Sequence, residues 1–163
     1  MTAELETTER ELAPLDLRSR IQILEQGLAA LPGAFFGDSD NCPLKHSFGN
    51  GIYMREIFIP KDTILTGKIH RHSHPNVLMA GRVAVVTEGA GLQILEGPMA
   101  MISKAGTKRA LVALTDLHWI TFHNVGEERD LEKIEAIVIA ETYEQFEAEQ
   151  LEAAQRKDIS WPG

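Results

Sequence analysis

The sequence predicts an all-β fold, a sandwich or a small barrel, with helical segments at both ends. Between positions 51 and 126, short stretches rich in Ile, Val, Leu and Thr recur at intervals of about 8–12 residues, as in small β proteins. Glycines punctuate this region at positions 51, 67, 81, 89, 91, 97, 106 and 126. The chain has 163 residues, the length of one domain, so it can bury a core without disulfides.

The hydrophobic pattern places the individual strands. We expect strands near residues 52–59, 63–72, 77–87, 92–96, 98–103, 108–114 and 117–123. Glu88–Gly91 has the composition of a hairpin turn, and the apolar run Ala136–Ala140 indicates one further strand.

Two segments have helical patterns. Apolar residues recur at steps of four and three at Leu17, Ile21, Leu24, Leu28 and Leu31. This spacing predicts an amphipathic helix that Asp16 caps and that Pro32-Gly33 ends. The helix packs on its own domain or forms a seam between subunits, and its length of only two heptads favours the first. A second helix is expected from Tyr143 to Gln155, with an apolar face so thin that it lies loosely on the surface.

Composition and charge exclude several classes of protein. The net charge of −8 is divided unevenly: −3 in residues 1–32, +2 in 33–126 and −7 in 127–163. No dense basic stripe is present, which argues against a nucleic-acid binder, whereas a few local bases suffice for a small anionic ligand. No run of 18 apolar residues and no secretory signal occur, so we expect no membrane partner and a cytoplasmic location. The lone Cys42 excludes an intramolecular disulfide and a thiolate-rich zinc site.

A cluster of histidines is the most informative motif. His70, His72 and His74 alternate along one predicted strand, so their imidazoles are expected on one face. Neutral imidazole is a common ligand of divalent transition metals such as Zn, Fe, Mn or Ni. The alternative is a solvated, histidine-rich edge strand. Pro75 should bend or end the strand, and the amide of Asn76 is placed to reach the same cavity.

A fourth histidine lies on a later strand. The two-residue period of a strand puts Trp119, Thr121 and His123 on one face. If that face is the interior, His123 completes a metal site with His70 and His74; the alternative is a histidine that caps the strand end. The same pattern puts Trp119 in the core and leaves His118 exposed.

These motifs resemble those of the cupin family. Gly81 fits the glycine that closes the first cupin motif, and His74 stands where the family has glutamate. Gly106 fits the second motif, in which Arg109 replaces the usual metal-binding histidine. A group of phage-encoded cupin-like proteins of unassigned function is more similar still. The matching pieces are residues 42–48, 53–60, 67–88, 106–109 and 119–123.

The resemblance implies a more specific fold and domain organisation. It implies an all-β, cupin-like double-stranded β-helix (jelly-roll) barrel over residues 34–140. An N-terminal extension with the amphipathic helix, residues 1–33, precedes it, and an acidic C-terminal helix and tail, residues 141–163, follow it. The H-x3-H-x-N pattern of the phage-encoded group matches His70, His74 and Asn76.

Basic and aromatic side chains are candidates for ligand binding. A guanidinium cannot hold a cation but can bind carboxylate or phosphate, so Arg109 is expected to bind an anion inside the barrel. The alternative is a structural ion pair of Arg109 with Glu56 or Asp116. Lys108 should face solvent. Tyr53 and Arg55 share one strand face, which lines the cavity or faces solvent. We interpret Cys42 and His46 as structural.

The function expected from these features is that of a metal-binding, cupin-like phage protein. It would bind a small anionic molecule in the barrel; whether it also acts on that molecule is undecided. One alternative is a non-enzymatic protein that sequesters a host metabolite or signal, and another is a structural component of a virion. A homodimer or higher homo-oligomer is expected, because small barrels expose edge strands. A phage-encoded protein would lie in the host cytoplasm, or in the virion if it is structural.

Overall fold

The computed structural model describes residues 15–158, and strands form most of it. The strands of one sheet are β1 (Leu44–Gly49), β2 (Ile52–Ile59), β5 (His74–Ala80), β8 (Met99–Ser103) and β10 (Leu117–Asn124). Those of a second sheet are β3 (Ile64–Thr66), β6 (Arg82–Thr87), β7 (Gly91–Glu96) and β9 (Arg109–Ala113). Two short strands, β4 (Ile69–His70) and β11 (Ile139–Ala140), pair with each other.

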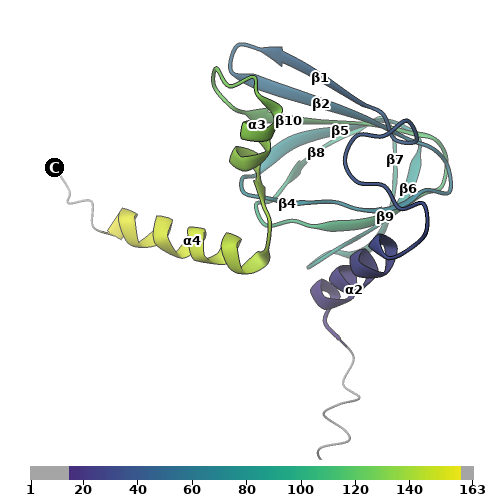
Figure 1. The fold of residues 1–163 in the computed structure, drawn as a ribbon, viewed down its shortest axis with the longest axis horizontal. Helices are drawn as coiled ribbons and strands as arrows, with labels where there is room; N and C mark the ends of the chain where they lie inside the picture. The colour runs from purple at the N-terminus through teal and green to yellow at the C-terminus, as the bar shows by residue number, and fades with distance from the viewer. Residues whose placement is uncertain (1–14, 159–163) are drawn as a thin grey trace, which may run out of the picture.

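The two larger sheets face each other (Figure 1). Their strand orders are β1-β2-β10-β5-β8 and β3-β9-β6-β7, and all the pairings are antiparallel. The predicted all-β, cupin-like jelly roll is confirmed. Among residues 15–158, however, the strands form three separate hydrogen-bonded sheets and not one closed barrel. The opening between the sheets is where the candidate site lies.

The core fills the space between the two sheets. Its most deeply buried side chains, each no more than 1% exposed, are Cys42, Leu78, Val83, Val85 and Ala113. The predicted core position of Trp119 is confirmed, since only 6% of this residue is exposed. Alternation along β10 puts Trp119 and His123 on the inner side of the sheet.

The segment predicted as one strand over 63–72 is divided. It forms β3 and β4, and β4 ends at His70 because residues 71 and 72 form a bend. The predicted strand over 77–87 is divided by Gly81 into β5 and β6. Pro75 does not end a strand: it lies inside β5, opposite Ile102 of β8. The predicted hairpin turn is confirmed between β6 and β7.

Helix α2 (Leu17–Ala29) begins where the sequence predicts and ends two residues early. The backbone N–H of Ser19 donates to the carboxylate of Asp16 at 2.9 Å, which confirms the predicted N-cap. The helix packs against β3 and β9. Lys108 does not face solvent as predicted: it is 7% exposed, and its ammonium group donates to Glu25 of α2 at 2.6 Å. The helix covers the start of β9 and thereby buries this lysine.

The apolar run that was predicted as a strand over 136–140 is mostly helical. Helix α3 spans Leu131–Val138, and only Ile139 and Ala140 are extended. Asp130 caps this helix through the N–H of Glu132 at 3.0 Å. Its buried residues Ile134 and Val138 lie one turn apart and pack against β2 and the chain after β10. The helical spacing of these apolar residues prevails over the β-branched composition of the run.

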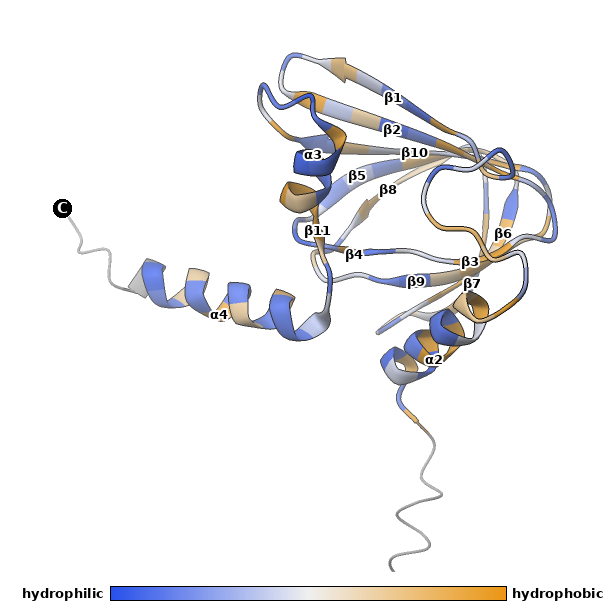
Figure 2. Cartoon of the chain, viewed as in Figure 1, coloured by the Kyte–Doolittle hydropathy of each residue, from blue (hydrophilic) through white to orange (hydrophobic). Residues whose placement is uncertain are grey.

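Helix α4 (Tyr143–Asp158) confirms the predicted C-terminal helix. Its first turns contact the sheets through Tyr143 and Phe146. Arg71 holds it through an ion pair with Glu149, whose nearest atoms are 2.8 Å apart. The remainder extends away from the sheets and is largely hydrophilic (Figures 1 and 2). None of the helices described is long and apolar enough to cross a membrane.

Gly81, which joins β5 to β6, is expected to tolerate no side chain. Its φ of +96° disfavours L-residues, and a Cβ atom there would lie 2.2 Å from the carbonyl oxygen of Asp116. We expect Gly81→Ala to lower the free energy of unfolding by at least about 2 kcal/mol, measured by urea denaturation. Gly89→Ala is the matched control, because Gly89 has a φ of +82° and open space around it. Equal losses in the two variants would contradict the steric part of this explanation.

Candidate metal and anion site

Three histidines from separate strands converge between the sheets. His70 ends β4, His74 begins β5 and His123 lies near the end of β10. One ring nitrogen from each can be chosen so that all three atoms lie within 4.8 Å of one another. The ring centroids are 4.3 Å apart for His70 and His74, and 4.6 Å apart for His74 and His123. The structure thus brings together the set that the sequence offered as a three-nitrogen site.

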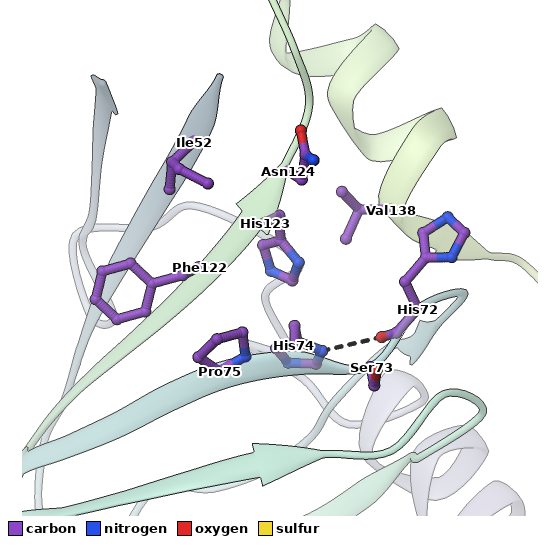
Figure 3. A pocket seen from close by; sticks show the side chains of 9 residues that line it. All are labelled: Ile52, His72, Ser73, His74, Pro75, Phe122, His123, Asn124 and Val138. Carbon is purple, nitrogen blue, oxygen red and sulfur yellow. Dashed lines mark hydrogen bonds between the residues drawn. The ribbon is translucent and has the colours of Figure 1, made fainter. Parts of the chain in front are cut away.

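His72 does not share the face of its two neighbours. The bend at residues 71 and 72 breaks the strand, so the two-residue alternation on which the prediction depended is lost. The side chain of His72 is exposed, and its ring lies apart from those of His74 and His123 (Figure 3). Its backbone carbonyl nevertheless accepts a hydrogen bond from Nδ1 of His74 at 3.2 Å. That bond fixes the tautomer of His74 and leaves the lone pair of Nε2 free to bind a ligand.

Burial keeps the three imidazoles uncharged. Desolvation, with a further contribution from the neighbouring histidines, lowers the pKa of His70 to about 2. Desolvation likewise lowers the pKa of His123 to about 3, and it lowers the pKa of His74. Neutral imidazoles with free lone pairs are the form that binds a transition metal, so the donor set fits such an ion.

Two arginines line the same cavity. Arg55 projects from β2 and Arg109 from β9, both are partly buried, and this burial lowers the pKa of each. Neither guanidinium forms an ion pair or a hydrogen bond with any group of residues 15–158. The alternative partners of Arg109 are engaged elsewhere. Glu56 pairs with Lys45 and His118, and Asp116 accepts the backbone N–H of Lys61.

Glu56 and His118 lie on the outer side of the five-stranded sheet. Nε2 of His118 is 2.8 Å from the carboxylate of Glu56, and the imidazole stacks on Phe58. His118 therefore lies on the face opposite His123, as predicted, but its side chain is only partly exposed, at 27%, because these two neighbours cover it.

Tyr53 and His46 form a pair beside the histidine cluster. The hydroxyl of Tyr53 lies 2.7 Å from Nδ1 of His46, and its ring stacks on that of His123. Both residues border the cavity, so of the two alternatives for Tyr53 the structure has the one in which it lines the cavity and does not face solvent. The sequence interpretation of His46 as purely structural missed its place in the wall.

The amide of Asn76 is engaged within the core. It donates to the hydroxyl of Ser103 at 2.7 Å and accepts from the indole N–H of Trp119 at 3.0 Å. These two bonds hold β5 against β8 and β10. Asn76 lines the cavity, but its amide is hydrogen-bonded within the core, which the prediction of a ligand contact did not foresee.

The cavity that contains this site has a volume of about 750 Å³. Besides the histidines and arginines, its wall includes the end of α2, the following residues 31–38 and the inner side of α3. Sequence reasoning missed these segments. The capping residue Asp130, followed by apolar residues at helical spacing, was a signal that could have revealed α3. A second cavity of about 230 Å³ shares His74, His123 and Val138 with the first (Figure 3).

Comparisons with known proteins find similarity in structure only. No family model and no curated protein matches the sequence. The solved structure of KdgF from Halomonas sp. is 16% identical, with a TM-score of 0.48, over 60% of this chain and 90% of that protein. Ectoine synthase from P. lautus is 14% identical, with a TM-score of 0.48, over 55% of this chain and 68% of that enzyme.

A third solved structure is described by its fold. It is an RmlC-like cupin family protein with a double-stranded β-helix fold from Methanocaldococcus jannaschii. It is 8% identical, with a TM-score of 0.44, over 56% of this chain and 86% of that protein. At these identities the similarity concerns the fold and not the activity. The architecture of this chain, as its own sheet topology shows, is an all-β jelly roll of two antiparallel sheets that face each other.

Proposed function

We propose that this protein binds a divalent transition metal through His70, His74 and His123, and that it binds a small organic or inorganic anion beside the metal. One observation carries the proposal: three neutral imidazoles and two arginines without acidic partners border a single cavity. Zn, Fe, Mn and Ni all accept imidazole nitrogen, and three protein ligands leave positions open for a further ligand.

The electrostatics of the cavity favour an anion. The charges of Arg55 and Arg109 are costly inside the protein unless a counter-charge is present. The acids at the rim of the cavity already have partners among the described residues: Glu25 binds Lys108, and Glu135 binds Lys68. Asp38 accepts the backbone N–H of Leu44. A bound anionic ligand is therefore the best source of negative charge to neutralise the two arginines.

The chemistry available at the site has a clear division of tasks. A bound metal would supply Lewis acidity and an open coordination position. The arginines would orient the anion through bidentate hydrogen bonds and neutralise its charge. Binding needs only these contacts, so a sequestering protein and an enzyme would share the same site.

Arg109→Ala tests the anion site directly. Loss of one charge-assisted contact is worth roughly 1.5–3 kcal/mol, so we expect the variant to bind malonate about 10- to 150-fold more weakly. Isothermal titration calorimetry on the metal-loaded protein measures this, with elemental analysis to show that metal content is unchanged. Arg82→Ala, which removes an exposed arginine outside the cavity, is the matched control. Equal affinities in Arg109→Ala and the wild type would contradict the proposal.

The quaternary state and the biological source stay predictions. The outer side of the four-stranded sheet exposes Leu92 and Ile94, which a second copy of the chain could cover. We expect light scattering at micromolar concentration to give the mass of a dimer or a larger homo-oligomer; a monomer mass would contradict this. A role in a virion predicts that the protein co-purifies with phage particles.

A further inference from the structure

The cavity has two chemically different halves. The histidines and arginines occupy the part of the wall that β2, β4, β5, β9 and β10 provide. Large apolar side chains from the end of α2 and the residues that follow it form another part. These side chains are Leu28, Leu31, Phe35 and Phe36.

The apolar part of the wall is incompletely covered. Phe36 is 75% exposed and Leu31 is 57% exposed, although both border the cavity. When an apolar group covers nonpolar surface that was in contact with water, the free energy falls by about 25 cal/mol per Å². A ligand that reaches this wall would therefore gain binding energy beyond that of its charged group.

The volume of the cavity leads to the same conclusion. About 750 Å³ lies within the usual range for pockets that hold whole organic molecules. A metal ion with an inorganic anion would leave most of that space, including the part beside Phe36, to water.

We propose that the ligand is an amphipathic organic acid. Its anionic group lies between Arg55, Arg109 and the three histidines, and its aliphatic or aromatic body lies against Leu28, Leu31, Phe35 and Phe36. This inference depends on the proposed function, because it takes the anion site as given, and it adds the chemical class of the ligand.

A series of straight-chain carboxylates tests the inference on the full-length, metal-loaded protein. Acetate, butyrate, hexanoate and octanoate carry the same charge and differ only in methylene groups. Each buried methylene contributes enough to raise affinity about fourfold, so we expect affinity measured by calorimetry to rise steeply along the series. Affinity that does not depend on chain length would overturn the inference.

Variants of the apolar wall test whether these residues cause the rise of affinity with chain length. Phe36→Ser and Leu31→Ser change exposed side chains, so the fold is preserved. Each should lower the affinity for octanoate much more than the affinity for acetate, and so flatten the dependence on chain length. The matched control is Phe58→Ser, which removes a partly exposed aromatic residue from the outer side of the five-stranded sheet, away from the cavity. A wall variant that retains the full dependence on chain length, or that changes only the mass measured by light scattering, would overturn the inference.

The two proposals fail in different ways. If malonate and acetate bind through Arg109 but longer chains gain nothing, the anion site stands and the amphipathic ligand is wrong. If no carboxylate in the series binds, and malonate does not bind either, the proposed function itself fails.

Discussion

Removal of bound metal is expected to lower the melting temperature, and His70→Ala is expected to abolish that response. A ligand present at 100 times its Kd stabilises the folded state by about 2.7 kcal/mol. For a protein of this size that corresponds to a shift of roughly 5–10 °C. The measurement is a thermal melt with and without chelator, paired with elemental analysis of protein purified without a His-tag.

The controls for the metal site come from the same stretch of chain. His74→Ala and His123→Ala should behave as His70→Ala does, because each removes one of three converging ligands. His72→Ala should keep its metal and its response to chelator, because its exposed ring lies outside the cluster. Loss of metal in His72→Ala alone, or a melt of the wild type that chelator does not affect, would contradict this assignment.

Metal-free protein is expected to lose stability steeply as the pH falls below 6.5. The ordinary pKa of histidine is 6.5, and burial lowers it to about 2 at His70 and to about 3 at His123. Below pH 6.5 the unfolded chain therefore binds protons at these histidines that the folded chain does not bind. As the pH is lowered, the free energy of unfolding decreases. Each such histidine contributes up to about 1.4 kcal/mol per pH unit. Urea denaturation at pH 7.5, 6.5, 5.5 and 5 measures the slope.

The pH window separates these histidines from the acids. Ion-paired carboxylates such as Glu56 and Glu149 have pKa values below 4.5, so the stability that they provide is lost only at lower pH. His70→Gln should make the slope between pH 6.5 and 5 shallower by about one proton, whereas His72→Gln, which removes an exposed imidazole, should not. A wild-type free energy of unfolding that stays constant from pH 7.5 to 5 would show that the cluster is solvated.

The sequence predicted the strands best where the pattern was local. Alternation along 117–123 placed Trp119 and His123 on the same face of a strand, and the capping residue Asp16 located the first helix. The run 136–140 was misassigned because β-branched residues suit both a strand and a buried helix. The Asp130 cap and the spacing of Ile134 and Val138 favour the helix, and packing of these two residues against Tyr53, which is distant in sequence, stabilises it.

The candidate site shows the same division between local and tertiary information. The sequence by itself determined the chemistry: imidazoles at 70, 74 and 123, and an arginine at 109 where a further metal ligand is usual in the family it resembles. Only the tertiary structure decided that His72 is excluded, because a bend at residues 71 and 72 breaks the alternation. It also decided that Lys108 is buried under α2, and that Phe36 borders the cavity. These outcomes depend on packing between segments far apart in the chain, and no local period of hydrophobicity records such packing.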